Sequence, residues 1–232
     1  MVREFKDTTA AGVNRVLATY EEIVDLATSD LAPEARRMRE AFQKRTGAFG
    51  PEDPWFEPRS RAFWDDALTT QGFATLAAPH LAAAPSRGAG DEAPQVAARF
   101  ERAHRGIFVV DEVDERGAHL VDLWSGAELL VRHIDEGQAV TFEHAEGPMD
   151  ARVVAGPPEE GALFALPGAL HHGPDAMEPI RRVIAAARER DMATGDVLDA
   201  LLRMELVFRS SSRVKAAFAY RVESLSRPSR VP

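Results

Sequence analysis

Between residues 106 and 166 the hydrophobic side chains change from a helical spacing to alternation with polar ones, and this change limits the possible folds more than any other feature. Short turns with an available glycine separate the alternating runs. Because such connections favour antiparallel neighbours and a flat sheet would leave long open edges, we expect a small antiparallel β-barrel or curled meander. The predicted strands are Gly106–Val110, Ala118–Trp124, Ala127–Arg132, Ala139–Phe142, Ala151–Val154 and Ala162–Leu166.

Helical spacing on both sides of this region predicts an α+β protein. The first 46 residues predict a helical hairpin, with Thr8 or Thr9 capping the first helix and Pro33 in the first turn of the second. Two shorter helices are expected around Phe63 and from 73 to 81. Beyond the strands, the sequence predicts helices that begin at Asp175 and at Thr194 or Asp196, and a last helix from 214 to 225 after a break at Ser210–Ser212.

These patterns divide the chain into four parts. Residues 1–81 form a helical region, and residues 82–94, which are rich in Ala, Gly, Pro and Ser, form a flexible linker. Residues 95–172 form an antiparallel β-module with a leading helix, and residues 173–232 form C-terminal helices with a basic tail.

The absence of cysteine excludes disulfides, thiolate catalysis and cysteine-bound metals. We find neither a signal peptide at the start nor an apolar run of the roughly 20 residues that cross a bilayer, which predicts a cytoplasmic protein without a membrane segment. No G-x-S-x-G, P-loop or G-x-G-x-x-G motif is present, so no cofactor is expected.

Charge is strongly segregated along a chain whose net charge is −9. Residues 106–166 carry 13 acidic and 3 basic side chains, whereas residues 209–230 carry 6 basic and 1 acidic. The basic stretch either pairs with carboxylates of this chain or of a second copy, or binds an acidic protein partner. Nucleic acid is unlikely as a partner, because the acidic region repels phosphates. The candidate partner-binding residues are Trp124, Arg209, Arg213, Lys215 and Arg221.

Histidine and carboxylate are the remaining candidates for a metal site. The candidates are His133, Glu143, His144, His171 and His172, which lie in or just after the β-region. None of them has an H-x-H or H-E-x-x-H spacing, so solvated histidines at strand ends are the simpler interpretation and no metal is predicted.

Aromatic residues are concentrated over nineteen positions of the helical region. The group comprises Trp55, Phe56, Phe63, Trp64 and Phe73. Aromatic side chains dominate core burial, so we interpret this group as core rather than as a ligand box.

Residues 106–154 resemble a β-rich module of bacterial proteins, some of which also contain the SEC-C motif. The likeness lies in Gly106–Gly117, in Leu120–Val131 with its D-L-W-S-G run, and in the return from Gly137 to Val154. It implies the β-module alone. The SEC-C zinc site cannot form here, since the chain has no cysteine.

The leading functional hypothesis is a non-enzymatic cytoplasmic protein-interaction or regulatory module. It rests on the lack of a convergent catalytic set and on the segregated charge. One alternative is a metal-dependent hydrolase that uses the histidines and carboxylates, and a second is a nucleic-acid accessory protein that uses the basic C-terminal helix.

Overall fold

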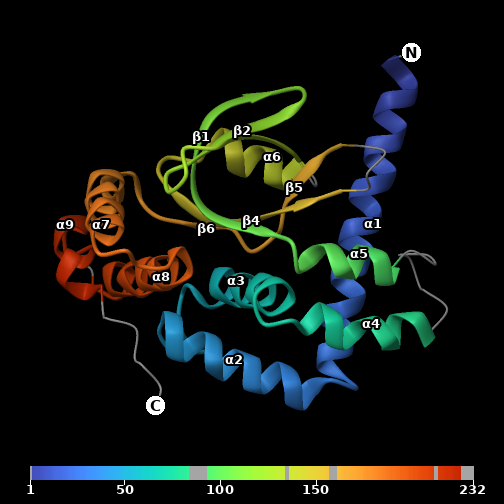
Figure 1. Cartoon of the computed structure of the whole chain (residues 1–232), viewed down its shortest axis with the longest axis horizontal. Helices are drawn as coiled ribbons and strands as arrows, with labels where there is room; N and C mark the ends of the chain where they lie inside the picture. The colour runs from blue at the N-terminus through green and yellow to red at the C-terminus, as the bar shows by residue number, and fades with distance from the viewer. Residues whose placement is uncertain (1, 84–92, 134–135, 157–160, 212–213, 226–232) are drawn as a thin grey trace.

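A computed structural model describes residues 2–83, 93–133, 136–156, 161–211 and 214–225, with side chains from residue 15 onward. A barrel of strands lies at the centre, with helices from both ends of the chain packed around it (Figure 1). The predicted α+β architecture with a small barrel is therefore confirmed. In the described part of the chain, no helix combines the length and the hydropathy that crossing a membrane requires.

Five helices precede the barrel, and their apolar stripes bury one another. They are α1 (Val2–Thr28), α2 (Ala32–Thr46), α3 (Phe56–Thr69), α4 (Phe73–Ala83) and α5 (Ala93–Phe100). The hairpin of α1 and α2 is confirmed, with Pro33 in the first turn of α2. The first helix begins at Val2, upstream of Thr8 and Thr9, so neither threonine lies at its start. Residues 84–92, which make up most of the predicted linker, lie outside the described residues.

Five strands close into a barrel, and a sixth extends it. They are β1 (His104–Asp114), β2 (Gly117–Asp122), β3 (Glu128–Arg132), β4 (Met149–Ala155), β5 (Leu163–Ala165) and β6 (Leu170–His171). The order is β1-β2-β3-β5-β4, with β4 pairing back to β1 and also to β6. The pairing of β3 with β5 is parallel. The barrel is thus mixed rather than purely antiparallel as predicted, because β5 lies between β4, with which it pairs antiparallel, and β3, with which it pairs parallel.

The expected strand Ala139–Phe142 is wrong, because this segment forms helix α6 (Glu136–Glu143). Val140 and Phe142 would lie on one face of a strand, yet Phe142 is 2% exposed and Val140 is 51% exposed. Phe142 belongs to the core cluster inside the barrel. A helix satisfies its own backbone hydrogen bonds, so it can close one end of the barrel without a strand partner.

The five barrel strands take the order β1-β2-β3-β5-β4-β1, with helix α6 between β3 and β4. Strand β1 pairs with β4 through its first half and with β2 through its second half, and the register shifts between Val110 and Glu112. This irregularity lets a single long strand bend and pair with both neighbours.

The chain after the barrel forms a second helical layer. Its elements are η1 (Pro174–Ala176), α7 (Met177–Glu189), α8 (Thr194–Ser210), α9 (Ala216–Ala219) and η2 (Val222–Ser224). The helices expected at Asp175 and Thr194 are confirmed. The single last helix from 214 to 225 is wrong, since α9 ends before Tyr220. The chain leaves the α-helix at Tyr220 and makes only the short 3-10 helix η2, and both Tyr220 and Leu225 are buried in the core cluster formed with α7 and α8.

A closed ring of alternating charges joins the helical layers to the barrel. We call it the charge ring; in order its members are Arg45, Asp66, Arg152, Asp150, Arg105 and Asp199. Five of the six contacts between neighbours are 2.5–2.8 Å, and the contact between Arg152 and Asp150 is 3.7 Å. The members come from α2, α3, β4, β1 and α8, so three arginines and three aspartates meet in the interior without net charge.

Candidate functional site

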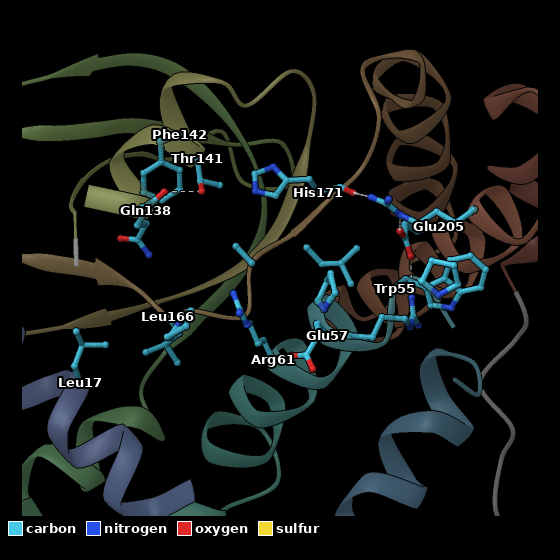
Figure 2. Close-up of a pocket in the computed structure, with 18 residues that line it drawn as sticks. Leu17, Trp55, Glu57, Arg61, Gln138, Thr141, Phe142, Leu166, His171 and Glu205 are labelled. Carbon is cyan, nitrogen blue, oxygen red and sulfur yellow. Dashed lines mark hydrogen bonds and ion pairs between the residues drawn. The ribbon is translucent and has the colours of Figure 1, made fainter. Parts of the chain in front are cut away.

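A cleft of about 660 Å³ lies between α3, α6, β6 and α8. Figure 2 shows its lining side chains, which come from segments far apart in the sequence. Its volume falls within the range of roughly 300–1,000 Å³ that is typical of small-molecule sites. We therefore take this cleft as the candidate functional site.

One wall is built on a triad of two arginines and one glutamate, in which Arg59 and Glu205 are buried and Arg209 is exposed. Arg59 and Glu205 are each 1% exposed, and Arg59 Nη1 donates to Glu205 Oε2 over 2.8 Å. Arg209 pairs with the other oxygen of Glu205. Burial raises the pKa of Glu205 despite both arginines. Because two arginines share one carboxylate, the triad carries one positive charge in excess.

His171 links this triad to the barrel. The backbone carbonyl of His171 accepts a hydrogen bond of 2.9 Å from Arg209 Nη2. His171 also pairs with Met149 of β4 in the sheet. The imidazole Nε2 is buried and has no hydrogen-bond partner among the described residues. Burial, with a contribution from Arg209, lowers the pKa of His171, so the imidazole is neutral at neutral pH.

A smaller hollow of about 380 Å³ adjoins the cleft, and the two share Thr141, His171 and Arg209. It also contains His144 and His172. His172 is buried, and its Nδ1 lies 2.7 Å from the Tyr220 hydroxyl. Burial lowers the pKa of His172 to about 3, which holds this imidazole in its neutral form.

Helix α6 forms the roof of the cleft. Gln138 Nε2 donates to the Ala165 carbonyl over 3.0 Å, which fixes α6 to β5. The Thr141 hydroxyl donates to the Gly137 carbonyl over 2.7 Å. This hydroxyl therefore satisfies its own helix, and no base activates it as a nucleophile within the described residues.

Arg61 enters the cleft from α3 and extends into the open space beneath α6 (Figure 2). Its side chain is exposed, and no described residue forms a hydrogen bond or ion pair with it. Apolar side chains border the same space, with Leu17 and Leu166 on one side and Trp55 near Glu205 on the other (Figure 2). The cleft thus combines a free guanidinium with apolar and aromatic walls.

The structure brings together only part of the predicted histidine and carboxylate set. His144, His171 and His172 line the smaller hollow, whereas His133 packs against Phe142 with ring centroids 5.9 Å apart. Glu143 is exposed. Within the described ranges, no three residues of types His, Asp or Glu are arranged to hold a metal ion.

The candidate partner-binding residues are dispersed. The guanidinium of Arg188 lies 5.4 Å from the centroid of the Trp124 ring, and Arg209 lies in the cleft. Lys215 and Arg221 are exposed at either end of α9, with Arg221 stacked over Phe218 at 5.5 Å. Arg213 lies outside the described residues.

Arg61, Gln138 and Thr141 were not identified from the sequence. No motif marks them, since they lie on three separate turns of α3 and α6 and meet only when the barrel packs on the helices. Trp55 was placed in a core group, and it does pack against the core while also lining the cleft. Phe63 and Phe73 of that group are fully buried, as predicted.

Comparison with known protein families, curated proteins and solved structures finds no match to this chain.

Proposed function

We propose that the protein is a non-enzymatic regulatory module that binds a small molecule in the cleft between α3, α6, β6 and α8. The observation that carries this proposal is the free Arg61 guanidinium in a cleft where Arg59, Glu205 and Arg209 are already paired with one another. Paired groups hold the walls in place, so a ligand meets a pre-formed site, and pre-formed sites bind with less loss of conformational entropy.

The chemistry of the cleft supports binding over hydrolysis. A hydrolase needs a nucleophile beside a base, or a metal with an open position. The Thr141 hydroxyl donates to its own helix, and Glu205 is occupied by two arginines. Neither group is available for proton transfer.

Charge also opposes the nucleic-acid alternative. Among five-stranded barrels, those of the OB-fold bind oligonucleotides on the face of their second and third strands and on adjacent loops. Here β1 ends at Asp114, the turn that follows contains Glu115, and β3 begins at Glu128. These carboxylates repel phosphates at the corresponding strands and loop of this barrel.

A blocking substitution tests whether the cleft binds ligands at all. Isothermal titration calorimetry with 2-naphthoate, 2-naphthamide and 2-naphthylmethylamine measures binding of probes that differ in charge. We expect at least one probe to bind, and Thr141→Trp to abolish that binding by filling the cleft from an exposed position. Val140→Trp, at an exposed neighbour on α6 that does not line the cleft, is the matched control.

The hydrolase alternative has its own test. The protein is assayed for release of p-nitrophenol from bis(p-nitrophenyl) phosphate and p-nitrophenyl acetate, with and without added Zn²⁺ or Mn²⁺. We expect no turnover above that of the free metal ion. Metal-dependent turnover that His171→Gln removes would instead establish an enzyme.

Binding of a protein partner stays a separate prediction, which rests on the segregated charge along the sequence.

A further inference from the structure

We infer that the ligand of the cleft is an organic anion, with one carboxylate or phosphate group bound by Arg61 and an apolar or aromatic body held against the walls. This inference rests on the proposed function and specifies its ligand class.

The first argument is the charge within the cleft. Its lining contains Arg59, Arg61 and Arg209 against Glu57 and Glu205, which leaves one positive charge in excess. The chain as a whole carries −9. A positive cleft concentrates anions locally, although the acidic protein as a whole repels them.

The second argument is which donors face the ligand. The Arg59 guanidinium turns inward and donates to Glu205, to the Thr46 carbonyl and to the Leu202 carbonyl. Arg209 uses its Nε for Glu205 and its Nη2 for the His171 carbonyl. An arginine has five N–H donors in a planar fork, so Arg209 retains donors beyond these two bonds and Arg61 retains all of its own.

The neutral His171 imidazole supplies a third polar contact. Its buried Nε2 has no partner among the described residues, and a buried polar atom left without a partner is costly. A ligand oxygen or hydroxyl that reaches the His171 ring would remove this cost. Arg61 and His171 lie on opposite sides of the cleft, on α3 and β6, so one ligand can bridge them (Figure 2).

The third argument is the apolar wall. Leu17, Leu166 and Phe142 border the cleft on the side of α1 and the barrel, and Trp55 borders it beside the triad. A simple inorganic anion would leave these apolar surfaces exposed to water. An aromatic or branched body buries them, and it gains roughly 25 cal/mol for each Å² of apolar surface removed from water.

The charge series of naphthalene probes tests this class of ligand. The three probes share one apolar body and differ in a carboxylate, an amide or an ammonium group. We expect 2-naphthoate to bind at least about tenfold more tightly than 2-naphthamide, the difference of one charge-assisted hydrogen bond. We expect 2-naphthylmethylamine not to bind. Phenyl phosphate tests whether phosphate substitutes for carboxylate, and inorganic phosphate tests whether the apolar body is required.

Arg61→Gln tests the residue that we place on the anion. Because Arg61 is exposed and unpaired, the variant should fold as the parent does, which circular dichroism and the unfolding midpoint check. We expect binding of 2-naphthoate to weaken about tenfold and binding of 2-naphthamide to be unchanged. Arg182→Gln, which replaces an exposed arginine on α7 away from the cleft, should leave both affinities unchanged.

The outcomes separate this inference from the proposed function. If 2-naphthamide or 2-naphthylmethylamine binds as tightly as 2-naphthoate, and Thr141→Trp still blocks it, the cleft binds ligands but the anion assignment is wrong. If 2-naphthoate binds equally to Arg61→Gln, the assignment is also wrong. If no probe binds, the proposed function fails together with the inference.

Discussion

Asp65 is a fully buried carboxyl group whose surroundings set the pH dependence of folding. Its Oδ1 accepts a hydrogen bond of 2.9 Å from the Tyr20 hydroxyl, and its Oδ2 accepts one of 2.9 Å from the Gly168 backbone. Burial nevertheless raises the pKa of Asp65 to about 7, because desolvation outweighs these bonds and the charge of Arg152. The folded state therefore holds a proton that the unfolded state releases near pH 4.

The sign of this effect follows from proton binding. Between about pH 4 and pH 7 the folded state binds more protons than the unfolded state, so stability falls as pH rises through this window and is constant above it. The loss reaches up to about 4 kcal/mol, at about 1.4 kcal/mol for each pKa unit. We predict that Asp65→Asn removes this fall, as measured by urea unfolding from pH 4 to pH 8. Asp25→Asn, at an exposed position of α1, should keep it.

His172 has the opposite pH dependence. Its pKa is lowered to about 3 in the folded protein, so its contribution to stability is complete above about pH 6.5 and is lost as pH falls toward 3. In the Asp65→Asn background the opposing effect of Asp65 is removed, so we expect stability to fall as pH is lowered, with His171 contributing to the loss in the same direction. The double variant Asp65→Asn/His172→Asn, whose new amide can still bond to Tyr220, should show a smaller loss over pH 4 to 6.5 than Asp65→Asn alone. An unchanged acid-side slope in the double variant would assign it to another group.

At the scale of elements, the charge ring determines how helices and barrel fit together. Asp66 is fully buried and accepts from Arg45 over 2.5 Å and from Arg152 over 2.7 Å. Burial opposes its ionisation, yet Arg152 and Arg45 hold the pKa of Asp66 below its usual value. We predict that Asp66→Asn lowers the free energy of unfolding by roughly 3–5 kcal/mol, since it leaves buried Arg152 and its neighbours with an uncompensated charge.

The matched control is Glu34→Gln. Its pair with Arg37 is also an acid–arginine contact, but the Arg37 side chain is 75% exposed. Removing this exposed pair should change the free energy of unfolding by no more than about 0.5 kcal/mol in urea titrations. Equal losses in the two variants would mean that burial does not distinguish the charge ring from surface pairs.

Elements whose apolar face has a regular period could be predicted from the sequence, and elements fixed by distant contacts could not. The stripe over residues 180–187 predicts α7, and the alternation over 118–122 predicts β2. Residues 139–142 are compatible with either state, and only the barrel end that receives Phe142 selects a helix. The cleft and the charge ring depend on pairs such as Arg45 and Asp199, which are 154 positions apart, so no local pattern indicates them.

At the scale of the whole molecule, these contacts imply that the helices and the barrel unfold together. The charge ring takes members from α2, α3, the barrel and α8, and Gly168 next to β5 donates to Asp65 on α3. A helical layer that separated from the barrel would expose Asp66 and Arg152 without their partners. That cost couples the layers and favours one cooperative transition.

Tryptophans placed in different parts of the molecule test this coupling. Trp64 lies on α3, and Trp124 packs against the C-terminal core cluster. The variant Trp55→Phe/Trp124→Phe retains only Trp64, and Trp55→Phe/Trp64→Phe retains only Trp124. We predict that each variant shows the same urea midpoint by its tryptophan fluorescence as by circular dichroism, and that adding Asp66→Asn lowers both signals together. If the fluorescence and circular dichroism midpoints differ within one variant, one layer unfolds before the other. The charge ring would then not couple the unfolding of the helical layers to that of the barrel.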